Sequence, residues 1–418
     1  MTSYKNKSVC VVDHGLFAEI AVKLTKEFGT VYYFCPWTGG YPKSNVYLIG
    51  TGLPGVKRVS SWEQVLDDVD LWVFPDVYNG PLQVHLDKLG KRVFGGRMGE
   101  ELELDRAASK KHCASLGIDI GPWRSIVGLD ALRSWLKQHE NQYVKVSCLR
   151  GDFETFCSRN YTNVEPRLDE LESTLGPRKK IIEFIVEDAI ADAVEIGFDG
   201  IIIEGNTSAN ATIGIEVKDK GFVMRTLRYG DVPEEIRGVN DKLASTFRKY
   251  KYRGFFSSEL RITKDHKAFL IDPCARAGSP PTELFLEMVS NWADVFWEGA
   301  EGRVVDLKFT GKFGAELMIV STWADKNWQA VDFPHSIRDN VKLRNLTVID
   351  GKFYVAPQWV GISDIGAVVA VGETQKAAIK ECTRLAEKVK GYFIEVPFEA
   401  LDEAEEGFDK LKSFGVKV

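Results

Sequence analysis

Short apolar runs alternate with amphipathic segments along the first part of the chain. The run "SVCVVDHG" (8–15) predicts a buried strand, and "LFAEIAVKLTKEFG" (16–29) has the apolar spacing and terminal glycine of a helix. The alternation continues in "TVYYFCPW", "DLWVFPDVYNG" and "KRVFGG". Strands that alternate with helices build parallel sheets covered by helices, so we predict an α/β domain at about residues 1–96.

Beyond residue 96 the pattern becomes a mixture of strands and helices, which is typical of α+β architecture. A helix is predicted over 100–116, and strands are predicted within 141–156 and 178–206. Further elements are a helix at about 239–250, neighbouring strands at 255–262 and from 269, and a helix over 282–302. From about residue 311, strands mix with helices at 374–391 and 398–414. A chain of 418 residues exceeds one compact core, so we expect several domains.

The composition is that of an ordinary soluble protein, with 44% hydrophobic and 27% charged residues. The net charge of −6 argues against nucleic-acid binding, which usually needs a basic excess. No apolar run is long enough for a membrane span, and the N-terminal residues lack the pattern of a signal peptide. Seven cysteines without a CxxC pair indicate free thiols, so we expect a cytoplasmic protein. The oligomeric state stays open, with a homodimer as the commonest assembly.

Two acids lie on the neighbouring strands predicted around residues 255–274. Glu259 precedes Asp272 by thirteen residues, and Cys274 and Arg276 follow at spacings of two. Residues two apart in a strand share a face, so Asp272, Cys274 and Arg276 project together. Two carboxylates on one surface repel each other unless a cation separates them, and Mg²⁺ binds such oxygens together with phosphates. Two solvated acids with an arginine partner explain the same pattern.

Lys145 lies in the apolar strand "YVKVS", where a buried ammonium group needs a partner such as a phosphate. Arg150 and Gly151 in the following loop can add a second cation and a close backbone approach. The alternative is a lysine on the wet face of a half-exposed strand.

Weaker signals come from three other places. The strand "IIEFIVED" carries Glu183 and Glu187, and such a segment can bind an adenine edge and ribose hydroxyls. Arg106 and Lys110 lie four apart on one helix face, within reach of a phosphate. His14 follows the first strand, a position that often faces a ligand in parallel sheets. Ordinary surface or structural roles explain each of these residues as well.

The order of these motifs resembles the ATP-grasp superfamily, and within it the phosphoribosylamine–glycine ligase family, over nearly the whole chain. The segments that carry the resemblance are "LDRAASKKHCASLGI", "YVKVS", "IIEFIVED", "SSELRI", "IDPCAR", "GSPPTELFLEMVSNWADVFWEGAEG" and "VVAVGETQKAAIKECTRLAEKVKG". The resemblance implies a Rossmann-like pre-ATP-grasp domain at 1–96 and an ATP-grasp domain of two subdomains at 97–305. It further implies a small lid subdomain at about 123–188 and a mixed α/β C-terminal domain at 306–418.

The resemblance also implies roles for matching residues. Glu259 and Asp272 correspond to metal-binding acids, and Arg276 to the arginine that contacts phosphate and the acyl-phosphate intermediate. Lys145 corresponds to the lysine on the nucleotide phosphates. Lys110 and Arg150 have no counterpart in this comparison and are nucleotide-binding candidates by their charge and position alone. Cys274 stands where the family has an asparagine ligand.

For the rest of the nucleotide, Arg106 takes the place of the first nucleotide-binding lysine. Glu183 and the backbone of Phe184 and Ile185 correspond to the adenine hinge. Glu187 corresponds to the ribose carboxylate, with Asp192 as the alternative.

The implied activity is that of an ATP-dependent carboxylate–amine ligase that uses ATP and Mg²⁺ and forms an acyl phosphate. The implied partners are a small carboxylate and a small amine. The segments "DHGLFAE" and "NTSANATIGIEVKDKG" replace the family's substrate motifs, so we expect substrates other than phosphoribosylamine and glycine. An ATP-binding regulator and another ATP-grasp phosphoryl-transfer enzyme are the alternatives.

Overall fold

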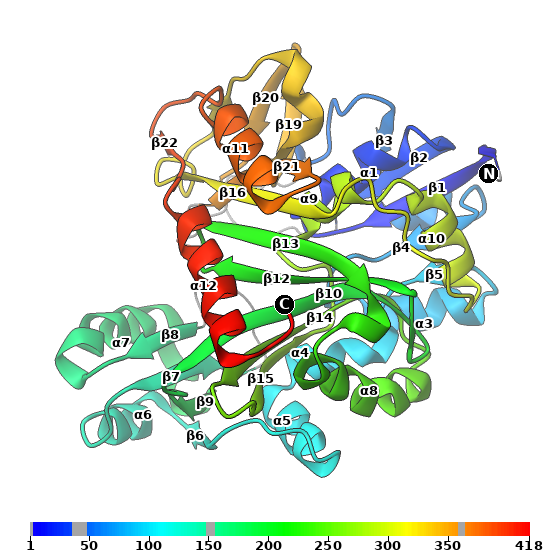
Figure 1. The fold of residues 1–418 in the computed structure, drawn as a ribbon. Helices are drawn as coiled ribbons and strands as arrows, with labels where there is room; N and C mark the ends of the chain where they lie inside the picture. Colours follow the sequence, from blue (N-terminus) through cyan, green and yellow to red (C-terminus); the bar gives the residue numbers. More distant parts are fainter. Residues whose placement is uncertain (1–2, 36–47, 148–154, 358–363) are drawn as a thin grey trace.

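The computed structural model describes residues 3–35, 48–147, 155–357 and 364–418. Its first sheet is parallel and has five strands in the order β3-β2-β1-β4-β5 (Figure 1). Alternate residues of β1 face opposite sides, so Val9 and Val11 join one apolar cluster and Cys10 and Val12 another. Both faces of this sheet are therefore covered, as expected for a parallel sheet. Its elements are β1 (Tyr4–Val12), α1 (Ala18–Leu24), β2 (Phe28–Phe34), β3 (Val56–Arg58), β4 (Leu71–Val73), α3 (Gly80–Lys88) and β5 (Arg92–Phe94).

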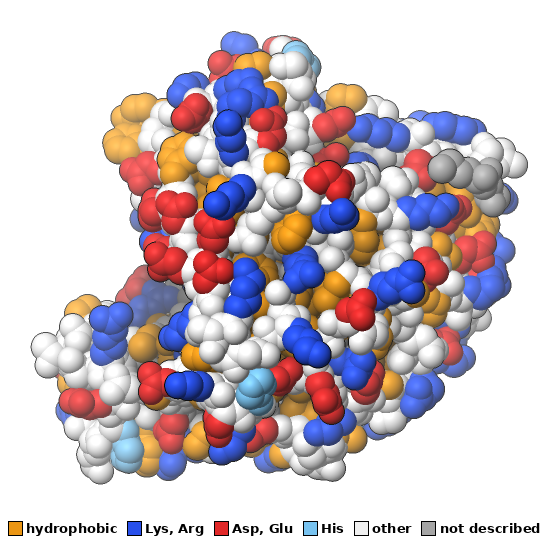
Figure 2. Space-filling view, in the orientation of Figure 1, with side chains coloured by type: hydrophobic (Ala, Val, Ile, Leu, Met, Phe, Trp, Pro, Cys, Tyr) orange, Lys and Arg blue, Asp and Glu red, His pale blue; other side chains and the backbone are white. Residues whose placement is uncertain are grey.

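A four-stranded antiparallel sheet forms a lobe at the lower left of Figure 1, with the strand order β6-β9-β7-β8. We call residues 123–188 the lid. Helices α6 and α7 close a hydrophobic core of its own, which includes Leu132, Leu168 and Phe184. Figure 2 shows a notch between this lobe and the part of the molecule above it. The lid elements are β6 (Trp123–Val127), α6 (Leu129–Leu136), β7 (Gln142–Val146), β8 (Thr155–Ser158), α7 (Tyr161–Leu175) and β9 (Glu183–Asp188).

A ten-stranded sheet occupies the centre of the molecule, with the main path β15-β14-β10-β12-β13-β16-β21-β18. β13 pairs with β16, so this sheet runs across the predicted boundary at residue 306. Its strands are β10 (Ala193–Ile203), β11 (Asn206–Thr207), β12 (Asn210–Val217), β13 (Gly221–Arg228), β14 (Arg253–Thr263), β15 (Ala268–Cys274), β16 (Phe313–Ser321), β18 (Val341–Leu343), β21 (Asp364–Gly372) and β22 (Ile394–Glu395). A small third antiparallel sheet contains β17 (Gln329–Val331), β19 (Leu346–Ile349) and β20 (Lys352–Val355).

Helices cover the large sheet and connect it to the parallel sheet. They are α8 (Glu234–Lys249), α9 (Thr282–Met288), α10 (Trp292–Ala300), α11 (Gln375–Ala386) and α12 (Ala400–Phe414). None of the helices in the described part of the chain combines the length and apolarity needed to cross a bilayer. One parallel sheet together with antiparallel sheets confirms the predicted combination of α/β and α+β architecture.

Two predicted helices are divided in the structure. The helix expected over 100–116 consists of α4 (Glu101–Leu104) and α5 (Arg106–Ser115). The break falls at Asp105, whose side chain accepts a hydrogen bond from the Ala108 amide and so caps α5. The helix expected over 282–302 is likewise divided, because Val289 adopts an extended conformation after α9.

Candidate functional site

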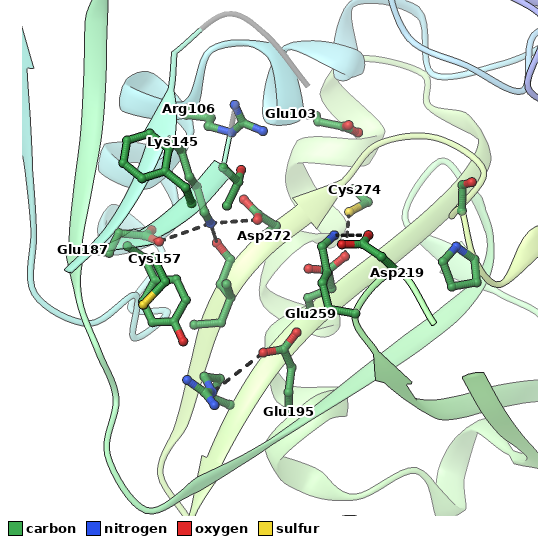
Figure 3. A pocket seen from close by; sticks show the side chains of 18 of the residues that line it. Glu103, Arg106, Lys145, Cys157, Glu187, Glu195, Asp219, Glu259, Asp272 and Cys274 are labelled. Carbon is green, nitrogen blue, oxygen red and sulfur yellow. Dashed lines mark hydrogen bonds and ion pairs between the residues drawn. The ribbon is translucent and has the colours of Figure 1, made fainter. Parts of the chain in front are cut away.

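A cavity of about 500 Å³ lies between the lid and the ten-stranded sheet (Figure 3). The lid contributes strand residues such as Lys145 and Glu187, and the opposite wall carries Glu259, Asp272 and Arg276. Leu16 reaches the cavity from the parallel sheet, and Met318, Arg344 and Asp364 reach it from the C-terminal part of the chain. The cavity therefore gathers residues from the N-terminal part, the lid, the large sheet and the C-terminal part of the described chain.

Lys145 is the buried cation at the centre of this arrangement. Its neighbours Val144 and Val146 face the core of the lid, so strand alternation turns Lys145 toward the cavity. The Lys145 Nζ lies 2.7 Å from Asp272 Oδ2 and 3.1 Å from Glu187 Oε2, and it donates a hydrogen bond to the Ile271 carbonyl at 3.2 Å. Burial alone would lower the pKa of Lys145, but the charges of Asp272 and Glu187 outweigh burial and raise it. Lys145 is therefore an ammonium ion that ties the lid to β15.

Two helix residues extend this network of charges. Lys110 forms an ion pair with Glu187, so that carboxylate has lysine partners on both oxygens. Arg106 donates from Nη1 to the Val146 carbonyl at 2.7 Å. Arg106 lines the cavity, whereas Lys110 lies at a smaller adjoining hollow.

The two candidate metal acids lie opposite each other on β14 and β15. The register of this strand pair places Glu259 against Asp272. Burial and the nearby charge of Asp272 raise the pKa of Glu259 to about 7. Burial would also raise the pKa of Asp272, but the charges of Lys145 and Arg106 outweigh it and lower that pKa. Asp272 is thus held ionised, whereas Glu259 resists ionisation as long as no cation lies between the two carboxylates.

This donor set fits a hard cation that takes its other ligands from elsewhere. The described residues hold no group of three or more His, Cys, Asp or Glu side chains arranged for a metal ion. Mg²⁺ commonly uses one or two carboxylates and completes its shell with water and phosphate oxygens. Glu259 and Asp272 supply those two carboxylates.

Cys274 lies on the same strand face and contributes a thiol to the cavity wall. Its Sγ donates to Glu259 Oε1 at 3.3 Å. Burial and the charge of Glu259 raise the pKa of the Cys274 thiol well above its usual value. The side chain is therefore a protonated thiol, which is a poor ligand for a hard cation.

Arg276 follows β15 and is held by a carboxylate from α4. Its Nε donates to Glu103 Oε1 at 2.8 Å, and its Nη1 donates to the Ala277 carbonyl at 2.9 Å. Burial would lower the pKa of Arg276, but the charge of Glu103 outweighs burial and raises it. The guanidinium thus stays charged in the cavity wall.

The residues predicted to bind the adenine edge lie inside the lid sheet and not among the described residues of the cavity wall. Phe184 and Ile185 belong to β9, which pairs with β6 on one side and β7 on the other. Both side chains are fully buried, and the Glu183 carbonyl accepts a hydrogen bond from the Ser147 amide. A ligand edge cannot reach backbone groups that are already paired in this way. The described cavity wall instead contains Glu187, Asp188 and Ile190, where the chain leaves β9.

Of the three remaining candidates, two stand apart from this cavity. Arg150 lies outside the described residues. His14 lies beside Asp76, with 3.5 Å between His14 Nδ1 and Asp76 Oδ2, and is not among the described residues of the cavity wall. Asp192 lies in the turn between β9 and β10 with a φ of 49° and is likewise not in that wall.

Several residues in the cavity wall were not singled out by the sequence. Glu195 lies opposite Arg261 on β10 and β14, with 3.7 Å between Glu195 Oε2 and Arg261 Nε. A charged residue inside the apolar run "AVEIGFDGIII" is the same signal that marked Lys145, so Glu195 could have been found. Lys218 and Asp219 also line the cavity. The local sequence around Glu103 and Arg344 shows no such pattern, because their partners, Arg276 and Glu283, lie far away along the chain.

Comparison of the whole chain with known proteins identifies its fold. No protein family and no curated protein matches the chain by sequence. Phosphoribosylamine–glycine ligase of Thermotoga maritima is similar in structure, with a TM-score of 0.68 and 17% identity over 93% of this chain and 98% of that chain. The biotin carboxylase domain of Hydrogenobacter thermophilus 2-oxoglutarate carboxylase gives a TM-score of 0.66 and 13% identity over 98% of each chain.

A third similar structure is N5-carboxyaminoimidazole ribonucleotide synthetase of Thermus thermophilus. Its TM-score is 0.59 at 12% identity, over 91% of this chain and 98% of that chain. At identities this low the likeness concerns the fold, and it extends over nearly the whole chain. All three are ATP-grasp enzymes, so the chain has the ATP-grasp fold.

Proposed function

We propose that the chain is an ATP-dependent ligase that joins a carboxylate to an amine and releases ADP and phosphate. The observation that carries the proposal is the convergence of Lys145, Glu259, Asp272 and Arg276 on one cavity of an ATP-grasp fold. Among the similar structures, the Hydrogenobacter domain was solved with MgADP and bicarbonate. That complex supports a nucleotide in the corresponding cavity here.

The nucleotide is proposed to lie between the lid and β15. Apolar side chains on both sides of this part of the cavity can enclose a base: Tyr143, Phe156, Ile190 and Ile271. Glu187 and Asp188, at the end of β9, can accept hydrogen bonds from ribose hydroxyls. Lys145 contacts Asp272, and the charge of Arg106 also acts on that carboxylate, so both cations can neutralise a phosphate that takes its place.

Binding requires an exchange of partners at Lys145. Its ammonium group now contacts Asp272, and a phosphate oxygen would replace that carboxylate. Asp272 and Glu259 would then hold Mg²⁺, which supplies neutralisation of phosphate charge when it is bound. The exchange keeps every buried charge paired, as a low-dielectric site requires.

The chain's own residues contribute position and charge rather than a covalent nucleophile. A substrate carboxylate oxygen attacks the γ-phosphorus, the bond to ADP breaks, and an acyl phosphate forms. The amine nitrogen then attacks the acyl carbon, phosphate leaves, and the amine loses a proton. Lys145 and Arg276 stabilise the charge on the transferred phosphoryl group, and such electrostatic stabilisation is usually the largest catalytic contribution.

The test is ADP release measured over a panel of carboxylates and amines. The proposal predicts release that depends on both substrates and yields an amide. Substitutions Lys145→Ala and Asp272→Asn should abolish most of it. Unchanged ADP release in both variants would contradict the proposal.

A second candidate is an ATP-binding regulator without turnover, and Cys274 is the observation that favours it. A protonated thiol stands 3.3 Å from Glu259, at the strand position that follows Asp272 by two residues. This thiol adds no ligand for a hard cation. Tight MgATP binding with no ADP release over the whole panel would favour the regulator.

A further inference from the structure

Glu103 is a buried carboxylate in the cavity wall, contributed by α4. Its side chain is 7% exposed. Oε1 accepts the hydrogen bond from Arg276 Nε at 2.8 Å, and Oε2 accepts one from the Ala275 amide at 2.9 Å. Both oxygens are therefore committed to the segment that follows β15, although that segment lies more than 170 residues further along the chain.

This contact fixes one edge of the Arg276 guanidinium. An arginine side chain has five N–H donors in a rigid plane. Glu103 takes the Nε donor and the Ala277 carbonyl takes one from Nη1, whereas Nη2 makes no hydrogen bond within the described residues. Because the group is planar, holding Nε sets the direction in which Nη2 can donate.

The break between α4 and α5 gives Glu103 a second connection. Arg106 begins α5 and donates to the Val146 carbonyl at the end of β7, beside Lys145. The short segment 103–106 therefore contacts the residues that follow β15 through Glu103 and the lid through Arg106. The two cations that face the phosphoryl group in the proposed reaction, Lys145 and Arg276, are thus held relative to one another by this segment.

We propose that Glu103 is a positioning residue that orients Arg276 for the transfer of the phosphoryl group. The inference rests on the proposed function. Glu103 itself contacts neither substrate, and its effect passes through the direction of the Arg276 guanidinium. Its loss therefore affects the chemical step more than nucleotide binding, since only the transition state needs that direction.

The test is the kinetic effect of Glu103→Gln. The amide has one acceptor oxygen and one donor nitrogen, so it can accept from Arg276 Nε or from the Ala275 amide but not from both. We expect kcat to fall by about 100-fold, because small misplacements of catalytic groups cost that much. The KM for ATP should stay nearly unchanged. Glu103→Asp keeps both acceptor oxygens and should recover part of the lost kcat.

Glu19 offers a matched control outside the cavity. This buried carboxylate in α1 accepts hydrogen bonds from Arg338 Nη2 at 2.9 and 3.0 Å and from the Leu343 amide at 3.2 Å. Glu19→Gln should lower the thermal midpoint as Glu103→Gln does and leave kcat unchanged. If Glu103→Gln changes kcat no more than Glu19→Gln does, Glu103 is merely structural and the inference is overturned.

A second readout separates this inference from the proposed function. If the wild-type protein releases no ADP over the substrate panel, the proposed function fails. Glu103 is then judged by the NMR signal of Arg276 Nε–H, assigned by its loss in Arg276→Lys. A shift or loss of that signal in Glu103→Gln supports the claim that Glu103 orients Arg276, and an unchanged signal overturns it.

Discussion

Lys145 connects two carboxylates and two parts of the fold. Lys110, Glu187, Lys145 and Asp272 form a continuous row of alternating charges from α5 through the lid to β15. Each buried charge in this row has a partner of opposite sign, which is the condition for keeping charges out of water. Removal of the central cation should therefore affect both stability and activity.

Lys145→Ala should lower the free energy of unfolding by about 3 kcal/mol, because it leaves Asp272 and Glu187 without their shared cation. ADP release should fall on the order of 100-fold, since a charge on the transferred phosphoryl group loses its stabiliser. Denaturant titration and an ADP-release assay measure the two effects. Lys111→Ala, which changes an exposed lysine on the same helix as Lys110, should alter neither quantity. If Lys145→Ala changed stability and ADP release no more than Lys111→Ala does, the proposed role of the Lys145 ion pairs would be wrong.

The pKa of Glu259, about 7, predicts how cation binding depends on pH. A proton and Mg²⁺ compete for this carboxylate, so binding is weakened below that pKa and reaches its limit above it. MgATP affinity measured by calorimetry should rise roughly tenfold from about pH 6 to about pH 8. Glu259→Gln should remove most of that dependence. An affinity that falls as the pH rises would contradict the assigned role.

The residues that sequence reasoning found are those whose local pattern is unusual. Lys145 interrupts an apolar strand, and Asp272, Cys274 and Arg276 follow the two-residue period of a strand face. Glu103 and Arg344 escaped notice, because each pairs with a residue that only the tertiary fold brings near. The local sequence does not show which strand lies in the middle of a sheet. The pairing of the Phe184 and Ile185 backbone on both sides could therefore not be predicted.

Among the elements of the fold, those of the lid enclose a hydrophobic core of their own. The buried residues of the lid form an apolar cluster separate from the main core. β9, one of its two inner strands, leads directly to β10 of the large sheet, and Lys145 provides an ionic contact to β15. The lid can therefore loosen without loss of the main core.

Leu168→Ala tests that independence. Leu168 is fully buried in the lid core, and truncation of such a leucine costs about 3 kcal/mol. Amide hydrogen exchange should accelerate across residues 123–188, while β10 and β14 keep their protection. Leu243→Ala, in the main core, should instead accelerate exchange in the large sheet. Uniform acceleration in both variants would show that the lid and the main core unfold together.

The periodicity of apolar residues predicted most helices but not where they divide. The amphipathic pattern over 100–116 runs through Asp105 without interruption, whereas the Asp105 side chain caps a new helix there. An aspartate inside such a pattern is compatible with a helix interior or a cap, and tertiary contacts decide between them. Here the break places Glu103 and Arg106 where they contact β15 and the lid, respectively.

At the scale of the whole molecule, one cavity gathers residues from the parallel sheet, the lid, the large sheet and the C-terminal part. β13 and β16 join the last two in a continuous ladder of hydrogen bonds. The cavity wall also includes Leu16, Lys218, Asp219 and Arg344, which come from three distant segments. Two of those segments replace the substrate motifs of the family that the sequence resembles, which supports different substrates.

The central claim is that this cavity binds the phosphates of ATP between Lys145 and Arg276. Its most direct test is a crystal structure of the protein with Mg²⁺ and a non-hydrolysable ATP analogue. We expect phosphate oxygens on Lys145, Mg²⁺ on Glu259 and Asp272, and a broken contact between Lys145 and Asp272. An analogue bound elsewhere, with the Lys145–Asp272 ion pair still intact, would contradict it.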